Sequence, residues 1–256
     1  MPATPAWPPK SLPRLFVRAA LSEGAAIALD PGQANYLGNV MRKGIGDELL
    51  LFDGASGEWL ARVAGAGKKR MALSVERKTR PLEAVPDVWL AFAPVKRAQT
   101  DWMVEKATEL GAARLIPVMT QRTVAERVKL ERLESISIEA AEQCNRTSLP
   151  AIAEPLALAA FLKAIDRPLY FADEGGGAPV AEAMRAGPAA ILVGPEGGFT
   201  DEERALVRAI PQAVAVSLGP RILRAETAAL AALAAFMAVA GDWGLSTHKA
   251  KDAGAA

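Results

Sequence analysis

The residues best placed to do chemistry lie in a glycine-rich segment in the last third of the chain. Residues 194–199 read GPEGGF and directly follow the apolar run 189–193. Glycines leave backbone N–H and C=O groups open to a ligand, because no side chain stands in the way. Glu196 lies among them, and its position after a strand favours an acceptor for a ligand amine or hydroxyl over a solvated turn residue. For the glycines alone, a turn without a ligand is an equal alternative.

A second segment has the same layout of strand, Gly-Pro loop and helix. Residues 217–228 read SLGPRILRAETA. Arg221 and Arg224 lie close to the start of the predicted helix, where a positive charge opposes the helix dipole. Helix propensity therefore does not explain these arginines, whereas an anion site would. A surface ion pair between Arg224 and Glu226 is the alternative.

A third strand, predicted over 169–172, enters the glycine-rich loop DEGGG at residues 173–177. In open parallel sheets, ligands bind beyond the carboxyl ends of the strands. Three glycine-bearing loops that meet at one sheet edge would form one pocket. The glycine spacing matches neither the nucleoside triphosphate P-loop nor the dinucleotide pattern G-x-G-x-x-G.

The elements that would position these loops alternate along the second part of the chain. Apolar strands are predicted over 88–93, 114–118, 169–172, 189–193 and 213–218, and helices over 101–110, 130–143, 180–185, 201–209 and 226–239. Unbroken apolar strands between helices indicate a parallel sheet covered on both faces. Thr200 and Glu203 form a capping box, which predicts a helix start at residue 201.

The first part of the chain has a different pattern. Short alternating strands are predicted around 15–17, 48–52, 58–63 and 71–75, with one helical stretch over 33–41. This pattern is typical of a small, mostly β domain of barrel type. We therefore expect a β domain over 1–80, an α/β domain over 81–245 and a disordered tail over 246–256, with a proline-bearing linker around 79–87.

Charge is unevenly spread along the chain. The net charge is +1, yet residues 1–80 hold 12 Lys and Arg against 7 Asp and Glu. A basic front part suggests a phosphate-rich partner, although a merely soluble basic surface would give the same count.

The composition also excludes several kinds of site. Cys144 and His248 are the single cysteine and histidine. An internal disulfide is therefore impossible, and a zinc site or a catalytic Ser-His or Cys-His pair is implausible, so we expect no metal. Residues 1–13 lack an apolar signal region, and no apolar run reaches the length of a membrane span. These features predict a cytoplasmic protein without a membrane partner.

Together, residues 192–200 and 218–228 closely resemble the loop motifs of the bacterial 16S ribosomal RNA uracil-N3 methyltransferase family (RsmE), of the SPOUT class of knotted methyltransferases. Weaker matches are KATELG at 106–111, EAAEQCNR at 139–146, RLFV at 14–17, VMR at 40–42, GD at 46–47 and FDG at 52–54. The resemblance covers residues 14–243. Asn35 departs from the family, which often has histidine there, and this puts one possible RNA contact in doubt.

The resemblance implies an N-terminal PUA-like β-barrel and a C-terminal α/β domain with a parallel sheet and a trefoil knot. The knot loops of that family bind S-adenosylmethionine and form a homodimer. Motif matching assigns the cofactor contacts, many of them through the backbone, to Gly194, Glu196, Gly198, Leu218, Gly219, Ile222 and Leu223. Phe171 and Ala172, at the end of their strand, are expected to join them.

The implied reaction is methylation of N3 of a uridine in 16S ribosomal RNA, on the assembled small ribosomal subunit. Our hypothesis gives Arg224, or as second choice Arg221, the task of stabilising the uracil anion. Glu196 would act as base or cofactor anchor. RNA phosphates would be bound by the basic side chains Arg14, Arg18, Arg42 and Lys43. Arg146 would either reach RNA or have a capping or surface role.

Three other functions fit parts of the pattern. They are ribose 2′-O methylation by another SPOUT enzyme, a non-catalytic RNA-binding or ribosome-assembly factor, and an enzyme for small nucleotide-like molecules. The RILRAET sequence at 221–227 favours the uracil-type family over the first. The basic β domain counts against the last.

Overall fold

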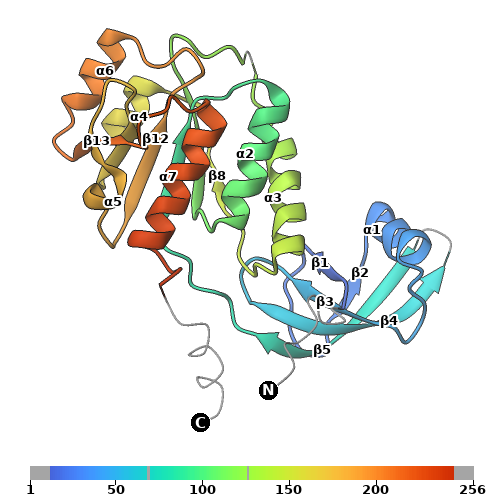
Figure 1. Ribbon diagram of the computed structural model, residues 1–256. Coiled ribbons are helices and arrows are strands. Elements are labelled where there is room, and N and C mark those ends of the chain that lie inside the picture. The colour runs from blue at the N-terminus through green and yellow to red at the C-terminus, as the bar shows by residue number, and fades with distance from the viewer. Residues whose placement is uncertain (1–11, 68–69, 126, 245–256) are drawn as a thin grey trace. The chain divides into compact units, whose positions relative to one another are not determined.

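The computed structural model describes residues 12–67, 70–125 and 127–244 (Figure 1). The chain divides into two compact units: an N-terminal unit, Met1–Glu83 with Ala141–Ser148, and a C-terminal unit, Ala84–Ala140 with Leu149–Ala256. The segment Ala141–Ser148 therefore groups with the first unit, whereas the sequence assigns it to the second domain. The tail expected over 246–256 lies outside the described residues.

The N-terminal unit is built on a five-stranded sheet. Its strands are β1 (Arg14–Phe16), β2 (Ala26–Ala28), β3 (Glu48–Phe52), β4 (Glu58–Gly67) and β5 (Arg70–Arg80), in the order β1-β3-β4-β5-β2. All neighbours are antiparallel except β1 and β3, which are parallel. Every second residue of β5 near its start, Met71, Leu73 and Val75, is buried, because side chains alternate between the faces of a strand. The predicted mostly β, PUA-like domain is confirmed.

The predicted helix over 33–41 is present in two parts. A short α-helix, α1 (Pro31–Asn35), continues into a π-helical turn, η1 (Tyr36–Val40). Asp30 starts α1, because its carboxylate accepts hydrogen bonds from the Gly32 and Gln33 amides at 2.8 and 2.9 Å. Shortly after η1 the chain turns at Arg42, which has a positive φ of 54°. A non-glycine residue in this region is under strain, and such strain gathers at functional sites.

The C-terminal unit contains a parallel sheet, as predicted. Its strands are β6 (Val88–Phe92), β7 (Arg114–Met119), β8 (Ala151–Ile152), β9 (Leu156–Ala157), β10 (Leu169–Ala172), β11 (Ala178–Pro179), β12 (Ala189–Val193) and β13 (Ala213–Ser217). The order is β11-β13-β10-β12-β6-β7-β8, with β9 also pairing with β7. Every pair is parallel. All five residues of β12 are buried, which explains its unbroken apolar sequence.

Helices cover both faces of this sheet. The helices α2 (Arg97–Glu109), α3 (Leu130–Cys144), α5 (Val180–Ala183) and α7 (Ala225–Val239) belong with one face, and α4 (Leu158–Ala164) and α6 (Asp201–Arg208) with the other. Successive side chains of β12 point to opposite faces of the sheet and pack against both layers of helices. Ile191 packs toward α7, and Leu192 packs toward α4 and α6. Figure 1 shows α7 beside α2 on the same side of the sheet. The capping box predicted at Thr200 and Glu203 is present at the start of α6.

Candidate active site in the C-terminal unit

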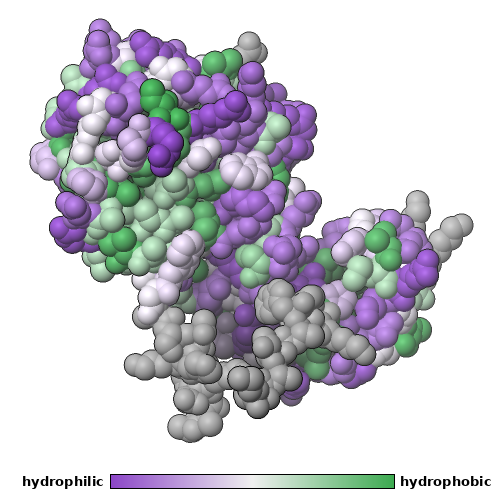
Figure 2. Space-filling view, viewed as in Figure 1, coloured by the Kyte–Doolittle hydropathy of each residue, from purple (hydrophilic) through white to green (hydrophobic). Residues whose placement is uncertain are grey.

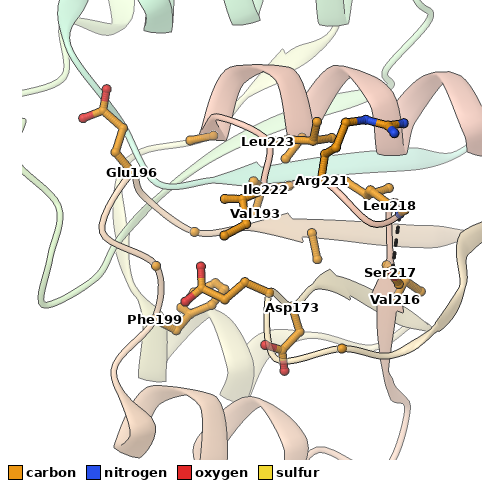
Figure 3. A pocket seen from close by; sticks show the side chains of 18 of the residues that line it. Asp173, Val193, Glu196, Phe199, Val216, Ser217, Leu218, Arg221, Ile222 and Leu223 are labelled. Atoms are coloured by element: carbon orange, nitrogen blue, oxygen red, sulfur yellow. Dashed lines mark hydrogen bonds between the residues drawn. The ribbon is translucent and has the colours of Figure 1, made fainter.

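Three loops at the carboxyl edge of the sheet line one pocket (Figure 3). Strand β10 lies between β12 and β13, and the ends of the three strands are level, since Phe171 pairs with Leu192 and Ala172 with Val216. The loops that follow therefore begin side by side. They contribute residues from the segments 173–176, 194–199 and 217–223, and the first turn of α7 completes the wall. The convergence predicted from three glycine-bearing strand ends is present.

Two glycines of the 194–199 loop are needed for its shape. A Cβ atom on Gly194 would lie 3.1 Å from the Phe199 ring, so a side chain there would press on the core. Gly198 has a φ of +67°, and a Cβ on it would lie 2.5 Å from the Glu174 carboxylate. The loop thus forms a narrow backbone cradle that larger residues would fill.

The pocket combines an apolar wall with charged groups. Val193, Val216, Leu218 and Leu223 contribute apolar surface. Glu196 is exposed, and Figure 3 shows it at the opposite end of the pocket from Arg221. A ligand with an apolar ring and a charged or polar end would match this arrangement.

Asp173, the first residue after β10, organises the charged side of the pocket. Its side chain is fully buried and accepts hydrogen bonds from Arg204 Nε at 3.0 Å and Arg208 Nη2 at 2.7 Å. It also accepts one from the Gly175 amide at 2.9 Å. Both arginines lie on α6, so these bonds fix the 173–176 loop to that helix. The sequence pattern missed this role, because Asp173 and its two arginine partners are more than thirty positions apart.

The loop between β7 and α3 supports the 194–199 loop from outside. Arg122 Nη1 donates to the Gly197 carbonyl at 2.6 Å. Glu203 accepts from the amides of Gln121, at 2.7 Å, and Thr200, at 3.0 Å. Arg122 and Glu203 were not among the residues expected to take part in the site. The capping-box motif predicts the Glu203 contact with Thr200, but the contacts of Glu203 with Gln121 and of Arg122 with Gly197 leave no sequence motif.

Most residues expected at the site line this pocket. They are Ala172, Gly194, Glu196, Gly198, Leu218, Gly219, Arg221, Ile222 and Leu223. Phe171 does not, because strand alternation turns its side chain into the core beside α4 and α6. Arg224 is the exposed residue that precedes α7, and it lies outside the lining.

Two of the residues predicted to bind RNA are buried in the N-terminal unit instead. Arg14 Nε donates to Glu58 at 2.8 Å, and its Nη1 and Nη2 donate to the carbonyls of Ala141 at 2.7 Å and Arg146 at 3.0 Å. The Arg146 side chain is also buried, with Nε donating to Ser148 at 3.0 Å. These contacts attach segment Ala141–Ser148 to the sheet. The prediction of phosphate contact is wrong for Arg14, because burial removes its guanidinium group from solvent. Burial likewise excludes the RNA contact and the surface role that were the alternatives for Arg146.

The same contacts perturb Glu58. Burial raises the pKa of the Glu58 carboxyl, but the hydrogen bonds and charges of Arg80 and Arg14 outweigh it, so the pKa lies below its ordinary value. Arg80 Nη2 donates to Glu58 at 2.7 Å and also to the Asn145 carbonyl at 2.9 Å. The Glu58 carboxylate is therefore ionised at neutral pH, where it pairs with both Arg14 and Arg80.

The other predicted RNA contacts are nearer the surface. Arg18 and Arg42 are exposed and Lys43 is half-buried. Around Arg42, the apolar side chains of Tyr36, Val40 and Ile45 are exposed as well. Figure 2 shows hydrophobic residues at the surface in the region of α1.

In the described part of the chain, no three His, Cys, Asp or Glu side chains are grouped as a metal site would require. Within the same residues, no helix is both long and apolar enough to cross a membrane.

Comparison with known proteins identifies the domains. The family model described as RNA methyltransferase domain matches residues 82–237, and the one described as RNA methyltransferase PUA domain matches residues 29–76. A ribosomal RNA small subunit methyltransferase E of Rickettsia conorii is 31% identical over 227 residues, which cover 86% of this chain and 93% of the relative. The enzyme of the same name from Synechocystis sp. is 34% identical over 232 residues, with coverage of 86% and 76%.

Two solved structures share the fold. The small subunit methyltransferase E of Neisseria gonorrhoeae, bound to S-adenosyl methionine, has a TM-score of 0.83 at 27% identity and covers 91% of this chain and 99% of its own. The methyltransferase Lpg2936 of Legionella pneumophila, in complex with the same cofactor, has a TM-score of 0.81 at 29% identity, with coverage of 90% and 99%. With its catalytic-domain match, its PUA match and its near full-length relatives, the chain belongs to the family of ribosomal RNA small subunit methyltransferase E, the RsmE-type RNA methyltransferases.

Proposed function

We propose that this protein transfers the methyl group of S-adenosylmethionine to N3 of a uridine in 16S ribosomal RNA, with the assembled small subunit as substrate. The observation that carries the proposal is the single pocket formed by three glycine-bearing loops at the carboxyl edge of the parallel sheet. Support comes from relatives named as small subunit ribosomal RNA methyltransferases and from two related methyltransferases solved with S-adenosylmethionine.

The residues of the pocket fit S-adenosylmethionine. The backbone cradle at Gly194 and Gly198 suits a ligand held through main-chain groups, and Leu218 and Leu223 suit the adenine ring. Further contacts of the cofactor would come from Ala172, Glu196, Gly219 and Ile222. When bound, the cofactor supplies an electrophilic methyl group on a positively charged sulfur. Phe171 is left out of this set because its side chain is in the core.

The uridine must present N3 without its proton. This atom lies on the base-pairing edge, so the target base has to be unpaired or drawn out of its stack. A guanidinium beside the uracil oxygens would stabilise the anion that forms. We assign this task to Arg221, which lines the pocket, or to Arg224, which lies three residues further along the chain and is the N-cap of α7. Glu196 is the proposed base, because it is an exposed carboxylate at the pocket.

The N-terminal unit would hold the RNA. Its proposed binding surface is formed by η1 and the turn after it, where Arg42 and Lys43 supply charge and Tyr36 supplies an exposed ring. Aromatic rings stack on unpaired bases, and cations bind the phosphates. Arg18, also exposed, would extend this surface.

We also propose that two copies pair through the cofactor loops and that the chain is threaded as a trefoil knot. The support for pairing is apolar surface near the pocket: Ile222 is 90% exposed, and Figure 2 shows hydrophobic residues at the surface along α7. The knot is supported by family membership. A cytoplasmic location follows from a ribosomal substrate.

The test is transfer of labelled methyl groups to small subunits isolated from cells that lack the modification. Label should enter assembled subunits faster than naked 16S RNA, and calorimetry should detect S-adenosylmethionine binding. A non-catalytic assembly factor would bind RNA without transferring label. Absence of both transfer and cofactor binding would overturn the proposal.

A further inference from the structure

A second pocket lies at the carboxyl edge of the same sheet. Its walls come from the connection between β6 and α2 and from the loop between β7 and α3, which Figure 1 shows beside the start of α2. Val95 and Leu133, both 3% exposed, and the half-buried Val128 make its apolar floor. The activity proposed above makes no use of this pocket.

Basic side chains surround the apolar floor. Lys96, Arg97, Arg127 and Lys129 are all exposed at its rim. None of the four forms an ion pair with another described residue. A fifth rim cation, Arg132, is paired with Asp101 at 2.6 Å. Four exposed cations around one hollow, unpaired with any carboxylate in the described part of the chain, favour an anionic ligand.

Two of these cations are unfavourable for the helix that carries them. Lys96 is the N-cap of α2 and Arg97 is its first residue, and the first turn of α2 contains no acidic residue. A positive charge at a helix N-terminus opposes the helix dipole. Secondary structure therefore does not account for Lys96 and Arg97, whereas a phosphate bound at the rim would.

The second pocket adjoins the proposed cofactor pocket. Strands β6 and β12 are neighbours, Phe92 pairs with Val193, and the Ala93 amide donates to the Val193 carbonyl at 3.0 Å. One pocket begins just after each strand. The β7–α3 loop also links them, because Arg122 contacts Gly197, while Val124, Ala125, Arg127, Val128 and Lys129 of the same loop line the second pocket.

We propose that this second pocket binds an unpaired nucleotide of the RNA strand next to the methylated uridine. The base would cover the apolar floor, and the rim cations would hold the flanking phosphates. Proteins bind single strands with this combination of apolar platform and cationic groove. The proposal rests on the proposed function and extends it, since it gives the catalytic unit an RNA contact of its own.

The first test reverses the rim charge. The double variant Arg97→Glu with Lys129→Glu, and each of its two single variants, is compared with Lys163→Glu, a single charge reversal at an exposed position of α4. The probe is a fluorescein-labelled single-stranded decauridylate RNA, followed by anisotropy over a range of salt concentrations. The rim variant should bind at least ~10-fold more weakly, and its salt slope should fall by about 1 for each lost phosphate contact. Lys163→Glu should stay within twofold, and S-adenosylmethionine binding by calorimetry should be unchanged in both variants.

The second test locates the base directly. A decauridylate carrying 4-thiouridine is photo-crosslinked to the wild-type protein, and the crosslinked peptides are identified by mass spectrometry. Crosslinks to residues 94–101 or 124–133 support the proposal. Crosslinks confined to other segments, or RNA affinity and salt slope unchanged in the rim variant, would overturn it. Equal displacement of the RNA by polyglutamate would overturn it too, because that would indicate an acidic peptide site.

Failure of the proposed function would give a different result. A wild-type protein that transfers no methyl group to small subunits, yet crosslinks RNA at the second pocket, would contradict the methylation proposal alone. A protein that methylates subunits at the same rate and KM with the rim charges reversed would contradict the second pocket alone.

Discussion

Gly198 is the residue on which the shape of the cofactor cradle most depends. Its φ of +67° suits glycine, and a Cβ would approach the Glu174 carboxylate. Gly198→Ala should therefore strain the loop by ~1–2 kcal/mol. If that strain falls on the bound form, the Kd for S-adenosylmethionine rises about tenfold, since 1.4 kcal/mol is a factor of ten. Calorimetry measures this.

The matched control is Gly187→Ala. Gly187 also has a positive φ, +118°, but open space surrounds its Cβ position and it is not part of the pocket. This variant should lose a similar amount of stability and keep its cofactor affinity. Equal affinity losses in both variants would show that the effect at Gly198 is general destabilisation.

Arg221 and Arg224 should affect turnover and leave cofactor binding intact. Replacing the arginine that stabilises the uracil anion with alanine should lower kcat by about 10²–10³-fold, as for the loss of an oxyanion donor. Cofactor affinity should stay within twofold, and Lys163→Ala serves as the control. Full turnover in both Arg221→Ala and Arg224→Ala would contradict the assignment.

Single residues were predictable where a motif contained them and unpredictable where a fold brought them together. Gly194 and Gly219 could be found because each follows an apolar strand in a recognisable loop. Arg204 could not, because its partner Asp173 is far away in sequence. Arg14 was misread because its charge suggested phosphate, whereas in the structure Glu58 neutralises it inside the N-terminal unit.

At the scale of elements, the contact between α6 and the 173–176 loop should contribute measurably to stability. Asp173→Ala removes a fully buried carboxylate and leaves Arg204 and Arg208 without it. We expect the free energy of unfolding to fall by about 2–3 kcal/mol in urea titrations. Asp201→Ala is the control, because Asp201 also pairs with Arg204 but is 97% exposed, and such pairs contribute below ~1 kcal/mol. Equal losses of unfolding free energy in Asp173→Ala and Asp201→Ala would contradict the claim that burial strengthens the Asp173 contacts.

The Glu58 cluster should make the N-terminal unit sensitive to acid. The folded-state pKa of Glu58 is lowered, so its contribution to stability is complete above the unfolded pKa and is lost as pH falls through the folded value. Glu58→Gln should therefore destabilise the protein at pH 7, and the difference from wild type should shrink below about pH 4.3. Thermal unfolding over pH 3–7 checks this. Glu23→Gln, at an exposed position, should show no such trend.

The main helices and strands followed from their hydrophobic period, and the minor ones did not. The strand β12 and the helix α7 were predicted to within a residue, since long apolar runs mark them. The two-residue strands β8, β9 and β11 carry no periodic signal, and α4 was not predicted at all. These three short strands form by pairing, β8 and β9 with β7 and β11 with β13, and only the folded chain reveals such pairing.

At the scale of the whole molecule, the sequence predicted two domains from a change in period and charge. It did not predict that Ala141–Ser148 would join the N-terminal unit. Hydrogen bonds from Arg14 and Arg80 to the carbonyls of this segment explain the grouping. The sequence could not predict them, because every residue has a backbone carbonyl and such acceptors leave no sequence pattern. In the function proposed here, the C-terminal unit transfers the methyl group, and both units contact the RNA: the N-terminal unit at η1 and the C-terminal unit at the second pocket.

The most direct measurement identifies the methylated atom. Small subunits from cells lacking the modification are incubated with the protein and S-adenosylmethionine, and the 16S RNA is digested to nucleosides for mass spectrometry. We predict one new product, 3-methyluridine, that requires both the protein and the cofactor. A ribose-methylated nucleoside, or no methylated product, would contradict the account.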